Sequence, residues 1–438
     1  MVKSSRRSAL EILNRIDAGG GYSNLLLDTE LSKPGFNKSD KAFITALVYG
    51  VLENRLTADY VIARSSRLQL GKIEPRVLNL LRLGVCQILF MDGVEDYAAV
   101  SETVELAQGR HIKGFANGIL RTVCREKEQG IPAWPDRETD EDGYLETRYS
   151  CPRRLIRKWR GEYGAAAAEG ILRSLKEKPL HTARVNTLRT TRGALLSILD
   201  GMAQESALDD NAIEFERMPE LNSLEAWKKG LFHLQGAASQ LCCEALGAQP
   251  GETVLDLCAA PGGKSFTIAE MMQNRGRLLA CELHESRLPL IVRGAERLGI
   301  TILSTVCNDA SLRNPALGMA DRVLCDVPCS GLGVIRSKPE IRYRPLEESA
   351  ALPALQYAIL CEGAAHVRAG GTLVYSTCTL SRAENEEIAS RFAGENAGFE
   401  PLRLPGRLHA PDYQATLLPH VFHTDGFFVA AFRKKTGD

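Results

Sequence analysis

The sequence lacks an excess of charge of either sign. Its 54 lysines and arginines match its 54 aspartates and glutamates, so the molecule as a whole is not a polybasic binder of nucleic acid, and any basic surface must be local. It also lacks an apolar run of the roughly 18 residues that a membrane-spanning helix requires, and its N-terminus is charged where a signal peptide is apolar. We therefore expect a cytoplasmic protein that does not associate with a membrane.

The sequence has no CxxC pair, although it contains 12 cysteines. Without an export signal these cysteines are expected to stay reduced, so disulfides are not predicted. The spacing of His420 and His423 suits a metal, but these two side chains alone do not make a metal-binding set. We predict no metal site.

The length of 438 residues predicts two or three domains rather than one core. Residues 1–130 have apolar side chains at three- and four-residue steps, for example over 43–52, which predicts an all-α bundle. Gly19–Gly21 should end the first helix. Ser39–Asp40 should cap a helix that begins near Lys41.

Residues 131–150 hold six acidic and two basic residues with two prolines, and we interpret them as an acidic linker. Residues 151–200 reverse the balance, with 11 basic and four acidic residues. We predict a small α/β linker domain over 151–228 that contacts RNA, with Trp159 and Tyr163 stacking on bases; the alternative is a solvated helix face. Three arginines would neutralise phosphates: Arg153, Arg154 and Arg157.

Over residues 229–438, short β-rich runs alternate with amphipathic helical stretches. This alternation predicts a mostly parallel, Rossmann-like α/β sheet with helices on both faces. The predicted strands include 253–257 and 277–282 as the first two, a third that ends before Asp309, and 321–326 and 372–376 as the fourth and fifth.

The loop after the first of these strands is rich in small residues and leads into a helix. Small residues let a ligand approach the backbone, and the helix N-terminus offers free N–H groups. A proline and the lack of a complete GxGxxG favour a tight turn over a dinucleotide cradle. The predicted cofactor-binding residues of this loop are Cys258, Ala259, Ala260, Pro261, Gly262, Gly263 and Lys264; for Lys264 a surface position is the alternative.

Two acids narrow the ligand class. Glu282 ends the second predicted strand, where a carboxylate can accept hydrogen bonds from ribose hydroxyls, and Asp309 follows the third, where it can accept one from an adenine amine. Both positions indicate a cofactor that carries adenosine.

Two cysteines follow the fourth and fifth predicted strands, in Asp326-Val-Pro-Cys329 and in Ser-Thr-Cys378-Thr. Both loops lie on the ligand-bearing edge of the sheet. A thiolate can add to C6 of cytosine and so make C5 nucleophilic toward a sulfonium methyl group. Asp326, when it is protonated or shares a proton with the base edge, can hold N3 and the exocyclic amine. The residues by themselves do not decide which cysteine attacks.

Four ordered motifs carry a family resemblance. DLCAAPGGK at 256–264, DVPCSGLG at 326–333, STCT at 376–379 and TDGFFVA at 424–430 resemble the NOL1/NOP2/Sun RNA cytosine-C5 methyltransferases. The resemblance implies S-adenosylmethionine as cofactor, held by residues 258–264 with Glu282, Asp309 and Asp326. It also implies Cys378 as the nucleophile and Cys329 as the residue that assists product release.

The N-terminal segments SALEILNRIDAGGGYSNLLL and SDKAFITALVYGVLENRLTADYVI are similar to the helical RNA-binding NusB fold. Combined with the catalytic motifs they resemble the Sun/Fmu/RsmB branch, which implies methylation of 16S rRNA at cytosine 967. Cys281–Glu282 departs from the family, where Asp is common as the ribose acid. We expect 16S rRNA as partner, no DNA partner and a monomer.

Other classes of function fit the sequence less well. An enzyme that methylates an exocyclic amine needs an Asp/Asn-Pro-Pro-Tyr loop, which the sequence replaces by DVPC. A dinucleotide oxidoreductase has no use for two loop cysteines. The remaining alternatives are methylation of another rRNA or tRNA cytosine and a non-enzymatic, NusB-like RNA-binding factor, against which the presence of both cysteines argues.

Overall fold

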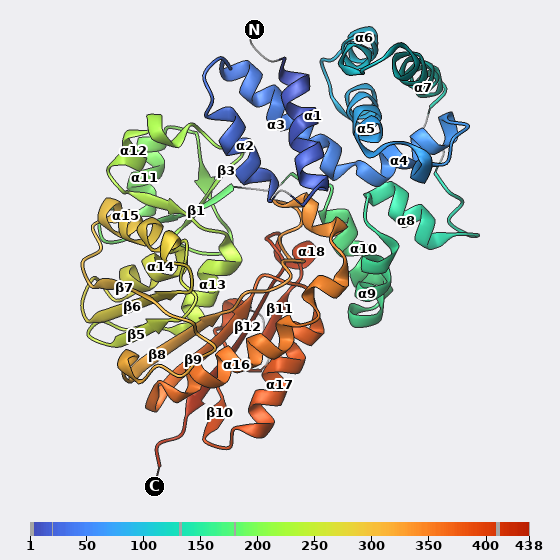
Figure 1. Cartoon of the computed structure of the whole chain (residues 1–438). Helices are drawn as coiled ribbons and strands as arrows, with labels where there is room; N and C mark the ends of the chain where they lie inside the picture. Colours follow the sequence, from blue (N-terminus) through green and yellow to red (C-terminus); the bar gives the residue numbers. More distant parts are fainter. Residues whose placement is uncertain (1–3, 20, 131–133, 179–180, 409–411, 438) are drawn as a thin grey trace. The chain divides into compact units, whose positions relative to one another are not determined.

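A computed structural model describes residues 4–19, 21–130, 134–178, 181–408 and 412–437, and the chain forms two compact units (Figure 1). The helical unit comprises Met1–Glu177 together with Ile335–Arg344, and the sheet unit comprises Lys178–Val334 and Pro345–Asp438. A short segment from the C-terminal half of the sequence therefore folds with the N-terminal helices.

The helical unit confirms the all-α prediction for the N-terminal part of the chain. Its helices pack around two apolar cores, to both of which α5 contributes, through Leu83 in one and Leu81 in the other. The elements are α1 (Ser5–Asp17), α2 (Ser23–Leu31), α3 (Lys38–Glu53), α4 (Arg55–Ser65), η1 (Leu70–Lys72), α5 (Pro75–Phe90), α6 (Asp96–Leu106), α7 (Arg110–Glu128), α8 (Glu141–Tyr149), α9 (Arg153–Tyr163), α10 (Ala165–Ser174) and η5 (Pro339–Tyr343).

Helix α3 begins earlier than predicted. Its cap is Asn37, whose side chain accepts from the backbone N–H of Asp40 at 2.9 Å, while the Asp40 carboxylate accepts from the Asn37 N–H at 3.1 Å. This reciprocal box satisfies two N–H groups and outcompetes the predicted Ser39 cap. Helix α1 ends at Asp17, before the predicted break, of which Gly20 lies outside the described residues.

The segment interpreted as an acidic linker contains helix α8. The side chain of Asp140 caps it by accepting from the Gly143 N–H at 2.9 Å, and Leu145 and Tyr149, four residues apart, are buried. Two apolar residues at helical spacing were thus enough to form a helix among many acids. Residues 131–133 of the predicted linker lie outside the described residues.

The basic run on α9 is largely matched by the acids of α8. Arg153 pairs with Asp140 at 2.6 Å, and Arg157 pairs with Asp142 at 2.6 Å. Trp159 is fully buried, so the prediction that it stacks on bases is wrong. It follows Leu155 and Ile156 by four and three residues and lies on the same apolar face of the helix.

The sheet unit begins at Lys178 with a small α/β layer, whereas residues 151–177, which the prediction includes in this domain, fold with the helical unit. Four antiparallel strands are ordered β2-β3-β1-β4, and their apolar side chains pack with α11 and α12. The elements are β1 (His181–Val185), α11 (Arg192–Leu199), β2 (Gln204–Glu205), β3 (Ala212–Phe215), η2 (Leu221–Ser223), α12 (Glu225–Lys228) and β4 (Phe232–Leu234).

The large sheet has the order β10-β12-β9-β8-β5-β6-β7, with β11 paired to β12. Strands β7, β6, β5, β8 and β9 are mutually parallel, whereas β12 runs antiparallel to β9. The strands are β5 (Thr253–Asp256), β6 (Arg277–Glu282), β7 (Leu303–Cys307), β8 (Ala320–Asp326), β9 (Val367–Thr377), β10 (Phe399–Pro401), β11 (Gln414–Leu417) and β12 (Phe427–Lys434).

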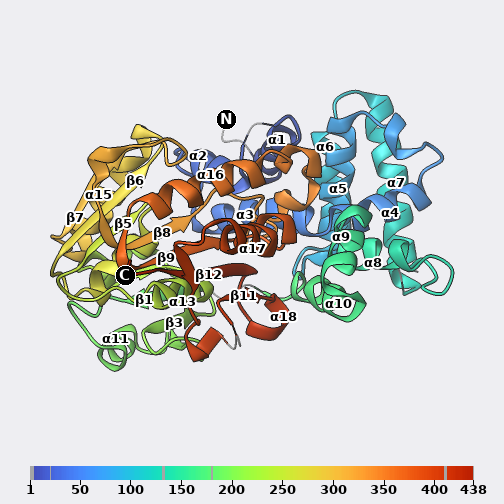
Figure 2. The ribbon, with the colours of Figure 1, turned by 90° about the horizontal axis from the view of Figure 1, so that it is seen from below.

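Helices cover both faces of the large sheet, which confirms the Rossmann-like prediction. Helices α13 to α15 contribute to the core of one face and α16 and α17 to that of the other; Figure 2 shows α13 and α16 on opposite sides of the strands. The remaining elements are α13 (Ala237–Leu246), α14 (Gly263–Met271), η3 (Glu285–Arg287), α15 (Leu288–Leu298), η4 (Pro315–Leu317), η6 (Leu346–Ser349), α16 (Leu352–Ala365), η7 (Arg382–Glu384), α17 (Glu386–Glu395), η8 (Gly406–Leu408) and α18 (Pro419–Phe422).

In the part of the chain that the structure describes, no helix combines the length and apolar character needed to cross a membrane.

Candidate active site

The order of the strands brings three loops together. Strand β8 lies between β9 and β5, and the order of the strands reverses between β5 and β8. In the parallel registers Asp256 is opposite Leu324, and Asp326 is opposite Ser376. The chain therefore leaves β5, β8 and β9 at the same edge of the sheet. Ligands of parallel α/β sheets bind at such a reversal point.

The two predicted catalytic cysteines lie in direct contact at this edge. The Sγ atoms of Cys329 and Cys378 are 3.2 Å apart, and both residues are partly exposed. The hydrogen bond to Cys378, together with burial, raises the pKa of the Cys329 thiol well above its ordinary range. Burial and the contact with Cys378 thus favour the protonated form of Cys329, while the geometry allows either sulfur to be the donor.

A buried carboxylate holds the Cys329 loop. Glu384 is 3% exposed and accepts from the Ser330 N–H at 2.9 Å and from the Ser330 hydroxyl at 2.6 Å. Gln356 on α16 donates to Glu384 and to the carbonyl of Pro328, both at 2.9 Å. The Ser330 and Thr379 hydroxyls are 2.7 Å apart. These bonds tie the Cys329 loop to the segment after Cys378.

A close backbone approach completes the cysteine site. The Gly333 N–H donates to the carbonyl of Cys378 at 3.0 Å, and the Gly426 N–H donates to the carbonyl of Gly333 at 2.8 Å. A Cβ at Gly333 would lie 2.0 Å from the Gly426 oxygen, so only glycine fits. The TDGFFVA motif thus supports the cysteine loops by bringing Gly426 against Gly333.

Lys264 connects the cofactor loop to the cysteine site. Its Nζ donates to Oδ2 of Asp326 at 2.7 Å, while Oδ1 of Asp326 accepts from the Ser376 hydroxyl at 2.8 Å. The Lys264 side chain is 12% exposed, so the surface alternative is wrong. Burial alone would lower the pKa of Lys264, but the charge and hydrogen bond of Asp326, together with the nearby Cys242 and Cys243, raise that pKa. The ammonium group therefore stays charged.

The cofactor loop makes a tight turn into α14, as predicted. Gly262 has a φ of +112°, and a Cβ there would lie 2.4 Å from the Phe266 ring, whereas a Cβ at Gly263 would meet nothing closer than 3.8 Å. Ala259 N–H donates to the carbonyl of Cys281 at 2.8 Å, which holds the loop against β6. The loop therefore presents small residues at the start of a helix, where a carboxylate ligand fits.

Asp256, which is not among the predicted site residues, holds the start of the helix that follows this loop. It is fully buried, and its Oδ2 accepts from the Ser265 hydroxyl at 2.6 Å. Burial raises the pKa of Asp256 to about 6, against the opposing effect of the Ser265 hydrogen bond.

The two predicted adenosine acids follow the neighbouring strands. Glu282 ends β6 and is held by Arg287 at 3.2 Å and by the His284 N–H at 3.0 Å. Asp309 follows β7 and accepts from Ser311, whose hydroxyl lowers the pKa of Asp309. Acids beyond β6 and β7, beside a small-residue loop after β5, fit S-adenosylmethionine.

The supporting residues were missed by the sequence analysis. Glu384, Gln356, Ser376 and Thr379 belong to common residue types at unremarkable positions, and their partners are distant in sequence. Only Ser376 and Thr379 have a sequence signal, because both belong to the STCT motif at 376–379. Among the described residues, no three His, Cys, Asp or Glu side chains are grouped so that they could hold a metal ion.

Three family models match the chain. Residues 243–433 match "16S rRNA methyltransferase RsmB/F", residues 3–125 match the NusB family, and residues 151–219 match the ferredoxin-like domain of RsmF/B-like methyltransferases.

Full-length relatives agree with these matches. The chain is 38% identical to "Probable ribosomal RNA small subunit methyltransferase B" of Bacillus subtilis (strain 168), over 99% of this chain and all of the relative. It is 31% identical to ribosomal RNA small subunit methyltransferase B of Escherichia coli O6:H1, over 96% of both chains. The crystal structure of PH0851 superposes with a TM-score of 0.81 at 25% identity, covering 98% of each chain.

Proposed function

Because this chain belongs to the 16S rRNA methyltransferase RsmB/F family, which uses S-adenosylmethionine, we propose that it methylates C5 of a cytosine in 16S rRNA, with cytosine 967 as the target. The observation that carries this proposal is the 3.2 Å separation of the Cys329 and Cys378 sulfurs beside the cofactor loop. A reaction that adds sulfur to a ring and later removes it has a use for two adjacent thiols.

Cys378 is the proposed nucleophile. Its thiolate forms a bond to C6 of cytosine, and the electrons of the C5–C6 double bond become available at C5. The raised pKa of Cys329 supports this assignment, because a protonated Cys329 donates a hydrogen bond that stabilises negative charge on Cys378. The reverse arrangement would need the thiolate on Cys329, where burial and the Glu384 charge disfavour it.

Cys329 is the proposed release residue. S-adenosylmethionine supplies a methyl group made electrophilic by its sulfonium centre. Methyl transfer to C5 releases the demethylated thioether; a base then takes the C5 proton, and the electrons of that C–H bond re-form the C5–C6 double bond as the bond between C6 and Cys378 breaks. Cys329 lies next to the sulfur that departs, so we assign to it the assistance of this elimination, which returns Cys378 as the free thiolate.

Asp326 is the proposed contact for the base edge. Its carboxylate is 26% exposed and accepts from Lys264 and Ser376. As an acceptor it suits the exocyclic amine of cytosine, and the fixed Lys264 charge prevents it from turning away. We propose cofactor contacts for residues 258–264, Glu282 and Asp309, as the acids and small residues after β5, β6 and β7 suggest.

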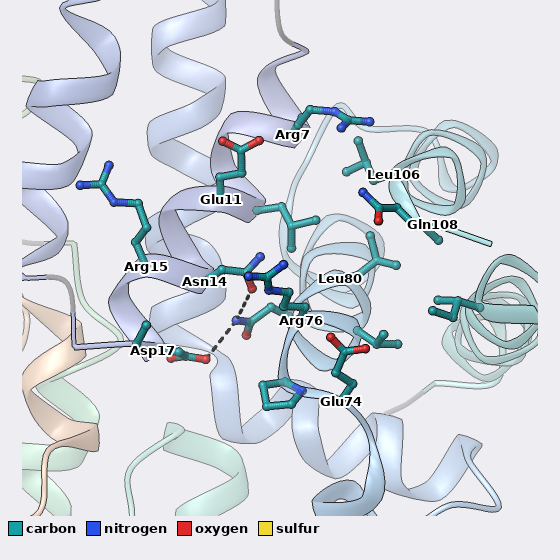
Figure 3. A pocket seen from close by; sticks show the side chains of 17 residues that line it. Arg7, Glu11, Asn14, Arg15, Asp17, Glu74, Arg76, Leu80, Leu106 and Gln108 are labelled. Carbon is teal, nitrogen blue, oxygen red and sulfur yellow. Dashed lines mark hydrogen bonds between the residues drawn. The ribbon is translucent and has the colours of Figure 1, made fainter.

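The helical unit is the proposed second RNA contact. It contains a pocket of about 830 Å³ lined by residues of α1, α5 and the α6–α7 turn (Figure 3). Arg7, Arg15 and Arg76 line it, and within the described residues none of the three forms an ion pair. Three acids line the same pocket: Glu11, Glu74 and Asp17, of which Asp17 is paired with Arg55 at 2.8 Å. Unpaired arginines suit RNA phosphates better than the paired arginines of α9.

The experiment that tests the chemistry is covalent trapping. RNA carrying 5-azacytosine at the target blocks elimination, so an attacking cysteine stays bonded to the base. We expect the wild-type chain and Cys329→Ala to form the adduct and Cys378→Ala to form none, with Cys124→Ala in the helical unit as the control. An adduct that survives in Cys378→Ala and is absent in Cys329→Ala would reverse the assignment.

The target is tested separately by bisulfite sequencing of 16S rRNA from a strain that lacks the gene. We expect loss of one 5-methylcytosine, restored by the wild-type gene and not by Cys378→Ala. Unchanged methylation of 16S rRNA would refute 16S rRNA as the target and indicate that the substrate is another RNA.

A further inference from the structure

The segment that follows the Cys329 loop leaves the sheet unit. The sheet unit ends at Val334 and resumes at Pro345, and the residues between them, Ile335–Arg344, fold with the helical unit. We call Ile335–Arg344 the strap. Its upstream end continues the loop fastened by Gly333. Its downstream end leads into α16, whose Gln356 holds the carbonyl of Pro328. Both ends of the strap therefore continue into residues that support Cys329.

A buried arginine anchors the strap. Arg342 is fully buried, and its Nη1 donates to the carbonyl of Ser150 at 3.1 Å. Glu53 supplies opposite charge nearby: burial raises the pKa of Glu53, and the Arg342 charge opposes that effect. A buried guanidinium that lost these partners would carry a large desolvation cost, so Arg342 fixes the strap in one place.

Two neighbours of Arg342 add further bonds. The hydroxyl of Tyr343 donates to the carbonyl of Leu52 at 2.6 Å. The Glu340 carboxylate is 5% exposed and accepts from the N–H and the hydroxyl of Ser23, at 3.0 and 2.9 Å. The strap is thus held through side chains at three of four successive positions, 340, 342 and 343.

The helical unit also grips the strap backbone. Arg154 on α9 donates to the carbonyls of Arg342 and Arg344, at 3.0 and 2.8 Å. This contact explains one arginine of the basic run, because Arg154 binds backbone of the strap instead of remaining available to phosphate. The strap is therefore bound from helices α2, α3 and α9 and from the turn after α8.

We infer that the helical unit positions the Cys329 loop of the catalytic site through the strap, with Arg342 and Tyr343 as positioning residues for the release step. The inference rests on the proposed role of Cys329. The strap and the loop are one continuous backbone, and a shift of about 1 Å at a reacting group is enough to lower a rate strongly. The helical unit then has a role in the reaction in addition to RNA binding.

The first test needs no RNA. Alkylation of Cys329 by iodoacetamide, followed by mass spectrometry, reports how the loop holds its thiol. We expect Tyr343→Phe and Arg342→Lys to change the alkylation rate of Cys329 by about fivefold or more, because a loosened loop changes exposure of a thiol held against Cys378. Arg82→Lys is the matched control, since Arg82 is a buried arginine of the same unit whose ion pairs are made with Asp59 at 2.7 Å and Asp17 at 3.5 Å and not with residues of the strap.

The second test follows the reaction. On ordinary RNA we expect Tyr343→Phe to slow release about tenfold and to accumulate the Cys378 adduct, with unchanged adduct formation on 5-azacytosine RNA and unchanged KM for the cofactor. The inference would be overturned if both strap variants released RNA and accumulated the Cys378 adduct as the wild type does. It would also be overturned if Arg82→Lys changed these two quantities as much as the strap variants do. A wild-type chain that traps no RNA would refute the proposed function, while the alkylation result would still decide the positioning role.

Discussion

The Nζ atom of Lys264 lies 2.7 Å from Oδ2 of Asp326, so an ion pair joins the cofactor loop to the loop that carries Cys329. Parallel strands β5 and β8 are adjacent, and the pair spans their carboxyl ends. The same contact therefore connects the loop proposed to bind the methyl donor with the carboxylate proposed to bind the base.

Replacing Lys264 should harm both stability and catalysis. In Lys264→Met the Asp326 carboxylate loses its counter-charge, so we expect the free energy of unfolding to fall by about 1–3 kcal/mol and kcat/KM to fall by about 10- to 100-fold. Urea unfolding and methyl transfer to RNA measure these two quantities. Lys228→Met, which removes an exposed pair with Glu225, should change the free energy of unfolding by less than about 0.5 kcal/mol. An equal effect of both variants would refute the special role of Lys264.

The buried Asp256 should give the stability a distinct pH dependence. Its pKa is raised from 3.8 to about 6 in the folded chain, so between these values the folded state keeps a proton that the unfolded state has lost. Stability from this group is therefore present below about pH 4 and is lost as the pH rises through about 6, a difference of about 3 kcal/mol. Asp256→Asn should remove this component of the unfolding free energy between pH 4 and pH 7. Parallel pH curves for the two chains would contradict the assignment.

Gly333 should not tolerate a side chain. In Gly333→Ala the new Cβ would meet the Gly426 oxygen at 2.0 Å and the Cys378 carbonyl at 2.8 Å, both of which are backbone atoms. We expect the unfolding free energy to fall by about 2 kcal/mol or more and trapping by 5-azacytosine RNA to slow. Gly394→Ala on α17, where nothing lies within 4 Å, should be neutral or stabilising by about 0.5–1 kcal/mol. Comparable loss in both variants would show that the close approach is unimportant.

The arginines of the helical pocket should govern the salt dependence of RNA binding. If Arg7 and Arg76 contact phosphates, the double variant Arg7→Ala/Arg76→Ala should weaken binding and reduce the slope of log K against log salt by about 0.7 for each lost contact. Arg173→Ala, which removes an arginine already paired with Glu169 at 3.0 Å, should leave the slope unchanged. Titrations at several salt concentrations measure this, and identical slopes in all three chains would exclude the pocket from RNA binding.

The contacts of the strap and of the basic run could not be predicted from sequence patterns. The basic segment around Trp159 predicts contact with RNA, yet the spacing of Trp159 from Leu155 and Ile156 indicates an apolar helix face. Arg153 and Arg154 carry the same charge and follow each other, but one pairs with acids of α8 and the other binds strap carbonyls. Charge in a sequence does not specify its partner, because ion pairs form between segments that the fold brings together.

The sequence by itself determined the alternation of strands and helices, the tight loop of residues 258–264 and the positions of Cys329 and Cys378 at strand ends, because periodicity and turn chemistry are local properties of the chain. Only the tertiary structure decided that the two sulfurs lie 3.2 Å apart, that Glu384 and Gly426 support them, and that Ile335–Arg344 folds with the N-terminal helices. These relationships depend on the order of strands in the sheet and on packing between residues far apart in sequence, which no local pattern encodes.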